Sequence, residues 1–307
     1  MIDPGGAAMF PFVPGQGRGA MVKRLVSSVL LLLSVSAPVA AEPMSAGQWA
    51  ALTHPVPERP SSVGGAAAGC LIGAQSLPAD SQGLQILRPQ RNRFWAHPRT
   101  VEFIEQLGRT AHHQGLGPLL IGDMSQPRGG PMAYGHGSHQ NGLDVDIWFR
   151  LPGKMLNARE LSNPTPVSMV RGRNVDSRNW SARQLKVLEL AANSSEVDRI
   201  FVNPAIKAAA CKAARGNTDW LAKLRPWWGH DEHFHVRLAC SIGDINCVTQ
   251  APVPPGDGCG AELSSWLAKS TVLPDHGRDK PNTRRPNLPS LCSQVLDQPG
   301  PREASAR

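Results

Sequence analysis

The fold and chemistry expected of this chain depend on two stretches: residues 135–146, GHGSHQNGLDVD, and residues 227–238, WWGHDEHFHVRL. Together they contain five of the ten histidines, and no histidine lies between Asp146 and His230. Each stretch ends in an alternation of apolar and polar residues. That period of two predicts a β-strand with one apolar face. The polar residues of each stretch therefore share the opposite face of their strand.

These polar residues are of the types that bind metals. The first strand places Asp144 and Asp146 on one face, and the second does the same for His233 and His235. His139 precedes the first strand in a glycine-rich loop that can fold back towards it. Zinc binds nitrogen and oxygen ligands tetrahedrally, and a catalytic site leaves one position for water. Either pattern alone is common on solvated strands, but the two together favour a catalytic zinc site.

The composition indicates a folded, exported protein. Of the 307 residues 41% are hydrophobic, which is enough for a sizeable core. Residues 21–41 combine a basic start, an apolar run and small residues before Glu42, which predicts a secretory signal peptide that is too short for a stable membrane span. A membrane anchor is the alternative, and Met1 and Met21 are both possible starts. The net charge of +8 suits an anionic cell-wall partner, whereas the scattered Lys and Arg residues argue against nucleic acid.

The cysteines predict disulfide bonds. All six follow the signal peptide, and an even number in an oxidising compartment is typical of disulfides. No pair has the C-x-x-C spacing, so a zinc-thiolate site is not expected. The turn-like spacer between Cys240 and Cys247 favours a short local bridge, and the spacing leaves the other pairings open.

Helical and strand patterns alternate along the rest of the chain. Residues 100–115 and a segment beginning at Ser181 have helical apolar stripes, the second with a capping box completed by Gln184. Further helices are expected at 203–214 and 219–224, and strands at 85–87, 119–121 and 199–202. We expect the rest of 42–98 and residues 150–180 to be irregular, and 250–307 to be a Pro-rich tail with a brief turn at 261–267.

Several motifs, in order, carry a resemblance to a known family. Residues 138–146, SHQNGLDVD, and 233–235, HFH, resemble the His-x6-Asp and His-x-His motifs of the zinc peptidase group that includes lysostaphin, D-Ala-D-Ala metallopeptidases and hedgehog domains. Within that group, the chain resembles the penicillin-insensitive murein endopeptidase family over roughly residues 65–295. The stretches that carry this likeness are 199–207 (RIFVNPAIK), 219–221 (DWL), 225–227 (RPW), 235–238 (HVRL) and 256–263 (GDGCGAEL).

The resemblance implies a fold and a set of roles. The fold would be α+β, with a small central antiparallel sheet flanked by helices and long loops and a zinc site on the sheet. It implies zinc ligands His139, Asp146 and His235, with His136 at a further metal-associated position. It also implies that His233 is catalytic and that His230 is a second active-site histidine.

The resemblance also implies an activity and a domain layout. The enzyme would be periplasmic and would hydrolyse peptide cross-links of peptidoglycan, chiefly of the D-alanyl–diaminopimelate type, through a zinc-activated water. Residues 1–41 would be an N-terminal extension and signal, 42–268 the zinc endopeptidase domain, and 269–307 a Pro-rich tail stapled by Cys292. The implied disulfides are Cys70–Cys292, Cys211–Cys259 and Cys240–Cys247.

One departure from the family pattern bears on the number of metals. That pattern has an Asp-x-x-His in the loop after the first metal strand, linked to a second metal. Residues 167–176, VSMVRGRNVD, contain no histidine. We therefore expect one zinc ion.

Three alternatives remain. In a D-Ala-D-Ala carboxypeptidase or dipeptidase of the same group, the base is a Glu at the position of Glu232; in a regular strand this residue faces away from His235, which favours His233. A non-catalytic, zinc-stabilised wall-binding module is the second alternative, and the presence of both His230 and His233 argues against it. A general secreted metalloprotease is the third, and the chain lacks the His-Glu-x-x-His motif. The substrate-binding residues and the oligomeric state are not predicted.

Overall fold

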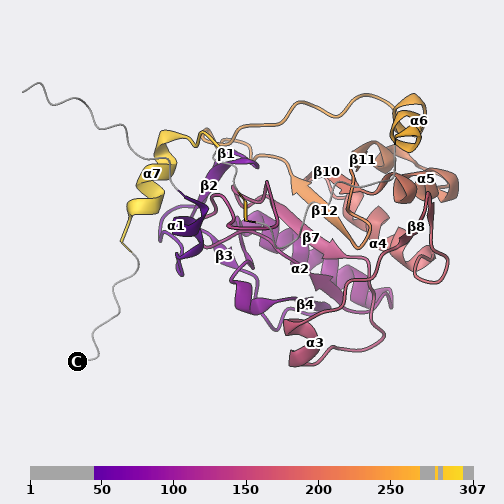
Figure 1. Cartoon of the computed structure of the whole chain (residues 1–307), viewed down its shortest axis with the longest axis horizontal. Coiled ribbons are helices and arrows are strands. Elements are labelled where there is room, and N and C mark those ends of the chain that lie inside the picture. The colour runs from indigo at the N-terminus through magenta and orange to yellow at the C-terminus, as the bar shows by residue number, and fades with distance from the viewer. Residues whose placement is uncertain (1–44, 270–280, 283–285, 300–307) are drawn as a thin grey trace, which may run out of the picture. The chain divides into compact units, whose positions relative to one another are not determined.

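A mixed sheet of six strands lies at the centre of the molecule, in the order β11-β10-β12-β7-β6-β4. The computed structural model describes residues 45–269, 281–282 and 286–299 (Figure 1). The three inner pairings are antiparallel, and the pairings with edge strands β11 and β4 are parallel. The α+β class is therefore confirmed, with a sheet that is antiparallel at its centre and mixed as a whole. The strands are β4 (Leu84–Ile86), β6 (Leu119–Ile121), β7 (Asp144–Trp148), β10 (Val197–Val202), β11 (Leu224–Pro226) and β12 (His233–Leu238).

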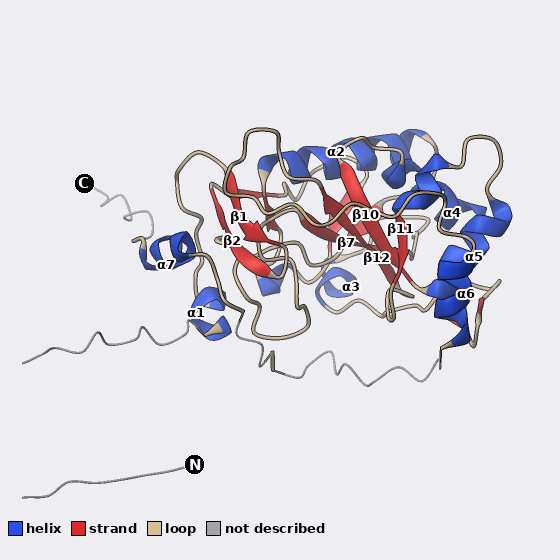
Figure 2. Ribbon diagram, turned by 90° about the horizontal axis from the view of Figure 1, so that it is seen from above, coloured by secondary structure: helices blue, strands red, loops and turns tan. Residues whose placement is uncertain are grey.

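Two long helices, α2 (Pro98–His113) and α4 (Ala182–Ala192), cover one face of this sheet (Figure 2). Apolar side chains of α2 and α4 form the main core with Val145, Phe234 and Val236 of the sheet. Helix α2 begins two residues before the predicted Thr100, because the His97 side chain accepts the Arg99 N–H and Pro98 occupies the first turn. Helix α4 has the predicted capping box at its start.

A second, smaller core lies beside β1 (Ser61–Gly65) and β2 (Ala68–Ile72), which form a hairpin. It contains Trp49 of α1 (Ala46–Ala50) and Cys292 of α7 (Ser290–Asp297). The expectation that residues 42–98 are irregular apart from one strand was therefore wrong. The hairpin shows little apolar alternation because it is built largely from small residues, which allow close approach of neighbouring backbone. At Gly69, for example, an added Cβ would lie 2.2 Å from the Val63 carbonyl oxygen.

The remaining elements are short and lie around the sheet. The chain also contains β3 (Gln75–Ser76), β5 (Trp95–Ala96), α3 (Ala158–Ser162), β8 (Val170–Arg171), β9 (Asn174–Val175), α5 (Pro204–Ala213), α6 (Ala261–Ala268) and two short 3₁₀ helices, Pro89–Arg91 and Asp219–Lys223. The predicted signal region, 1–41, and much of the predicted tail lie outside the described residues. Within the described part, no helix combines the length and hydrophobicity needed to cross a bilayer.

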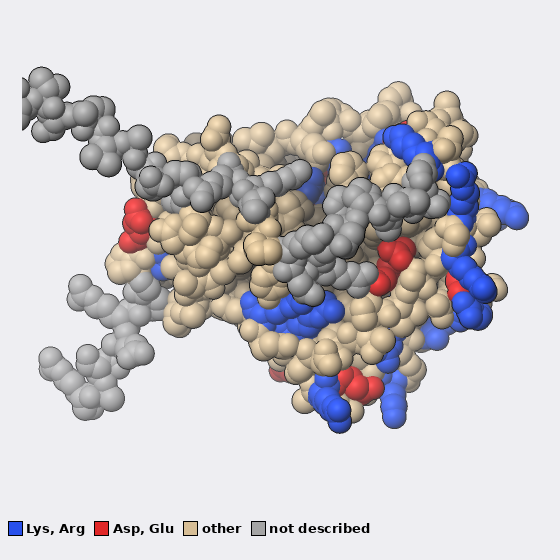
Figure 3. Space-filling view, viewed as in Figure 1, with Lys and Arg blue, Asp and Glu red and all other residues tan. Residues whose placement is uncertain are grey.

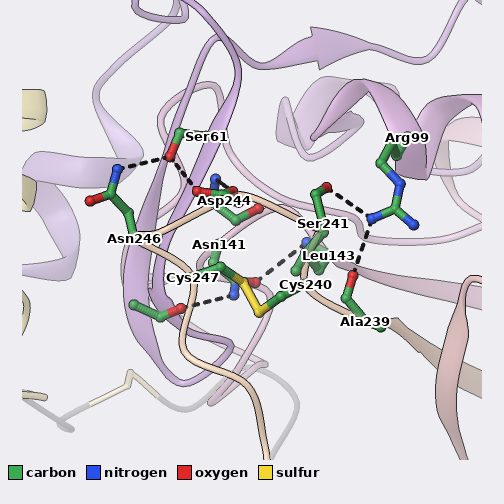
Figure 4. The surroundings of a disulfide bond; sticks show 12 residues. Ser61, Arg99, Asn141, Leu143, Ala239, Cys240, Ser241, Asp244, Asn246 and Cys247 are labelled. Carbon is green, nitrogen blue, oxygen red and sulfur yellow. Dashed lines mark hydrogen bonds between the residues drawn. A yellow bond between two sulfur atoms is a disulfide. The ribbon is translucent and has the colours of Figure 1, made fainter.

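All six cysteines form disulfides, in the three pairs that the resemblance implies: Cys70–Cys292, Cys211–Cys259 and Cys240–Cys247. The first joins the hairpin to α7, and the second joins α5 to the segment before α6. The third closes a short loop after β12 (Figure 4). The first disulfide thus fastens helix α7, near the C-terminal end of the described chain, to the hairpin.

Candidate active site and metal centre

The polar face of β7 and β12 carries the candidate site. The two strands pair antiparallel, with His235 opposite Asp146 and Arg237 opposite Asp144. The alternate residues of both strands point into the core beneath α2 and α4. The strand pairing therefore brings the two sequence motifs together on the face away from these helices.

Asp146 lies at the centre of four histidines. Its Oδ1 is 3.4 Å from His139 Nε2, 3.3 Å from His235 Nδ1 and 3.7 Å from His233 Nε2. Its Oδ2 is 3.6 Å from His136 Nδ1. Within the described residues, every ion-pair neighbour of this buried carboxylate is a histidine, and none is a lysine or arginine.

Several polar atoms of this cluster are buried without a hydrogen-bond partner. They include both ring nitrogens of His139, Asp146 Oδ1 and His235 Nε2. A buried polar atom without a partner is costly, and such atoms are few in native proteins. A cation among these atoms would satisfy them, so the donor set fits a metal ion.

Asp144, on the same strand, shares His235 with Asp146, since His235 Nε2 lies 3.3 Å from its Oδ2, but it also has an arginine partner. Arg237 donates from Nε to Oδ1 at 2.7 Å and from Nη2 to Oδ2 at 2.9 Å, and the His139 backbone N–H donates to Oδ2 at 3.0 Å. Two overlapping groups of side chains could hold a metal in the described part of the chain: His136 with His139 and Asp146, and His139 with Asp144 and His235. Asp144 has an arginine partner, whereas no lysine or arginine of the described residues pairs with Asp146.

The surroundings set the protonation of the histidines. Burial lowers the pKa of His139 to about 4 and that of His230 to about 3, and it also lowers the pKa of His233. These rings are therefore neutral at pH 7, and each keeps one nitrogen lone pair. Burial lowers the pKa of His235 as well, but Asp144 and Asp146 outweigh it and raise that pKa to about 9. A metal would take the place of this proton, because ligation requires the neutral ring.

Two of the site histidines have left-handed backbone conformations, His139 with φ 66° and His230 with φ 49°. A non-glycine residue in this region costs on the order of 1 kcal/mol, and such residues cluster at functional sites. At His139 the conformation is held by hydrogen bonds, because Ser125 Oγ donates to its carbonyl at 2.6 Å and its N–H is held by Asp144. The backbone thus fixes where this imidazole points.

The β1–β2 hairpin supports the next two residues of this loop. Gln140 donates its backbone N–H to Ala66 and its side-chain amide to Ala67, and Asn141 donates to Gly64. The Cys240–Cys247 loop holds the hairpin in turn, because Asp244 accepts from the Ser61 hydroxyl, as Figure 4 shows, and from the Ser62 N–H. Three segments far apart in sequence thereby fix the loop that carries His139.

His230 and His233 lie together at one edge of the cluster. Their ring centroids are 5.2 Å apart, and that of His230 is 6.0 Å from that of His235. His230 Nδ1 lies 3.1 Å from the Trp228 carbonyl oxygen. Glu232 immediately precedes β12 and belongs to neither metal-competent group in the described residues.

Sequence reasoning missed Asp123, which anchors His136. The Oδ2 of Asp123 lies 3.0 Å from His136 Nε2 and also accepts from Arg91 and Arg93 at 3.2 and 2.9 Å. Burial opposes ionisation, but His136 and the two arginines outweigh it and keep its pKa well below the usual range. The sequence feature that could have indicated Asp123 is its position two residues after the apolar strand 119–121, which is β6 and pairs with β7.

The comparisons with known proteins agree with this geometry. Residues 62–297 match the family described as penicillin-insensitive murein endopeptidase. The chain is 42% identical over 278 residues to the protein of that name from Yersinia enterocolitica, covering 90% of this chain and 98% of the relative. It is 43% identical over 280 residues to the one from Salmonella arizonae, covering 90% and 99%. The matched region contains the whole histidine cluster.

Proposed function

Since this chain belongs to the penicillin-insensitive murein endopeptidase family, and is therefore a peptidoglycan hydrolase, we propose that it cleaves peptide cross-links of the D-alanyl–diaminopimelate type with the help of one zinc ion. The observation that supports this most is the set of buried, unpartnered ring nitrogens and carboxylate oxygen of His139, Asp146 and His235. We assign these three residues as the zinc ligands.

The ligand set suits hydrolysis. When bound, zinc lowers the pKa of a coordinated water and polarises the scissile carbonyl. Two neutral imidazoles and one carboxylate leave the site with a positive charge, which an anionic developing oxygen requires. Asp144 and Arg237 neutralise each other beside the ligands and hold the His139 backbone, so they orient a ligand without adding net charge.

His233 and His230 are assigned to proton transfer. Burial keeps His233 neutral at pH 7, so its Nε2, 3.7 Å from Asp146 Oδ1, is available to accept the proton of the attacking water. His230 lies beside it and is also neutral. As the His233 ring becomes cationic, the nearby Asp146 charge stabilises it. His233 then returns the proton to the departing amine.

His136 is available as a further ligand through Nδ1, and its Nε2 contacts the Asp123 carboxylate, as is usual for a metal-bound histidine. We propose a single tightly held zinc ion, because residues 167–176 contain no histidine to complete a second site. The carboxypeptidase alternative assigns the base to Glu232; we favour His233, because its Nε2 lies 3.7 Å from Asp146 Oδ1 within the histidine cluster. The adjacent His230 and His233 favour catalysis over wall binding alone.

We also propose that the protein works in the periplasm. Three disulfides in the described residues suit an oxidising compartment, and the sequence carries a predicted signal peptide before residue 42. The predicted layout, with the catalytic domain at 42–268 and a tail at 269–307, belongs to the same proposal. Peptidoglycan, which is polyanionic, would be the partner.

Digestion of purified peptidoglycan tests the proposal. After muramidase digestion of the treated peptidoglycan, cross-linked dimers should be replaced by monomers; this cleavage should stop after treatment with a chelator and recover when zinc is added. A His139→Ala variant should be inactive, and His113→Ala, which removes an exposed histidine of α2, should match the wild type. Release of D-alanine alone would support the carboxypeptidase alternative. Full activity after zinc removal would refute the mechanism.

A further inference from the structure

We propose that a cavity beside His230 is a subsite that binds a carboxylate of the substrate peptide, with Arg173 as its cation. The cavity has a volume of about 130 Å³ and lies between the β8–β9 turn, the start of α5 and the loop before β12. Its lining includes Arg173, Asn203, Trp228 and Asp231. This inference rests on the proposed function, because it concerns how that substrate is held.

The sequence neighbours of His230 connect the cavity to the histidine cluster. Trp228 and Asp231 line it, and His230 lies between them in sequence. His230 is fixed relative to the cavity wall, because its carbonyl accepts from the Asn203 N–H and the Asn203 side chain donates to the Gly229 carbonyl. A substrate group in the cavity would therefore be held at a set distance from His230 and His233.

Arg173 is placed to receive an anion. It lies at the β8–β9 turn, and its Nη1 donates to the Leu267 carbonyl at 3.0 Å, which ties the turn to the end of α6. A guanidinium has five N–H donors, so one anchoring bond leaves most of them available. No carboxylate of the described residues forms an ion pair with Arg173. Arginine binds carboxylates in a bidentate manner, and this geometry confers specificity as well as affinity.

The other charged groups near the cavity also favour binding of a carboxylate at its Arg173 end. Asp231 also lines the wall, but its Oδ2 accepts from the Ser168 hydroxyl at 2.5 Å. Its charge would repel a carboxylate and direct it to Arg173. Arg171, on the same hairpin, adds positive charge, and lysine and arginine side chains gather along the edge of the molecule that carries α5 and β8 (Figure 3).

The ligand is therefore a peptide carboxylate rather than a sugar. The polar and aromatic groups of the walls are one cation, one carboxylate that is hydrogen-bonded to Ser168, one amide and one indole, and Val170, Pro204 and Leu267 add apolar surface for a short aliphatic chain. A cross-linked dimer carries such a group, since the stem that supplies the amine keeps its terminal carboxylate, whereas the other stem uses its D-alanine carboxyl in the cross-link. Amidation of the carboxylate would remove the charge while keeping the size, so matched substrates can isolate the contact.

The test compares two cross-linked muropeptide dimers, one with free carboxylates and one with the carboxylates amidated. For Arg173→Gln, KM for the free dimer should rise roughly tenfold, the scale of one charged hydrogen-bonded contact. KM for the amidated dimer should already be high in the wild type and should not change further. Arg173→Lys should restore only part of the affinity for the free dimer, because lysine keeps the charge but cannot form the bidentate contact of a guanidinium group. Arg159→Gln on α3 removes an exposed arginine outside the cavity and should leave both values unchanged.

Calorimetry with the free-carboxylate tetrapeptide provides a binding readout that does not need turnover. Arg173→Gln should weaken this binding by the same factor, and the amidated peptide should bind wild type and variant alike. Equal losses on both peptides, or no loss on either, would overturn the subsite. If the wild type cleaves neither dimer, the proposed function fails, and the calorimetric comparison still decides the subsite separately.

Discussion

Replacing Arg237 with alanine tests the ion pair beside the proposed metal ligands. Asp144 is fully buried, and Arg237 donates two short hydrogen bonds to it, at 2.7 and 2.9 Å. Removing one partner of a buried pair costs about 3–5 kcal/mol when the other charge is left uncompensated. Here His235 Nε2 remains 3.3 Å from Asp144 Oδ2 and compensates part of that charge, which places the cost at the lower end of the range. The bond from Arg237 to Gln250 is exposed and should add little. We therefore expect Arg237→Ala to lower the free energy of unfolding of the zinc-free protein by about 3 kcal/mol.

A double-mutant cycle with Asp144→Asn isolates the pair. In the Asp144→Asn background, removing Arg237 leaves no unpaired carboxylate behind, so Arg237→Ala should lower the free energy of unfolding by about 1 kcal/mol or less. Urea denaturation at pH 7 measures all four proteins. Additive losses, with no coupling between the two positions, would refute the reasoning.

The same pair has a predictable pH dependence. Burial raises the pKa of Asp144, but Arg237 and His235 outweigh it and hold that pKa well below its usual range. A depressed folded-state pKa contributes stability above the unfolded value of about 3.9, and that contribution is lost as pH falls towards the folded value. The cost of Arg237→Ala should therefore be complete at pH 7 and shrink below about pH 4, where the carboxyl group of the variant can take up a proton.

Three further outcomes follow. Glu232→Gln should lower cross-link cleavage only slightly, and a severe loss in the same assay would favour the carboxypeptidase-type base. Metal analysis after dialysis should find one zinc per chain, and two equivalents would mean that residues besides His139, Asp146 and His235 complete a second site. Burial lowers the pKa of Lys207 to about 8. Between about pH 8 and 10 the unfolded chain therefore keeps this proton while the folded protein has lost it, so the free energy of unfolding of the wild type should rise with pH relative to that of Lys207→Met. A difference between the two proteins that stays constant over this range would contradict the prediction.

The two strands of the candidate site could be predicted because their pattern is local. Alternation in residues 143–148 and 233–238 specifies both the strands and the shared polar faces, and glycine before the first strand indicates a folded-back loop. The helix at Ser181 was likewise predictable from its capping box. In each case, the determining residues lie within one element.

The remainder depends on contacts between distant segments. The hairpin of β1 and β2 is built from small residues, and it is defined by partners such as Asp244. Helix α7 lies in a Pro-rich segment and is held by Cys292. Asp144 and Asp146 have the same spacing and the same face, and only the position of Arg237 across the strands distinguishes the ion-pair partner from the proposed ligand.

Zinc content and cross-link cleavage, measured on the same samples of His235→Ala and His233→Ala, test the central claim most directly. His235→Ala should lose both zinc and cleavage, because it removes a ligand. His233→Ala should retain zinc and lose cleavage by roughly 10²–10⁴-fold, the range for a general acid–base residue. A His235→Ala protein that keeps its zinc, or a His233→Ala protein that loses it, would contradict the assignment.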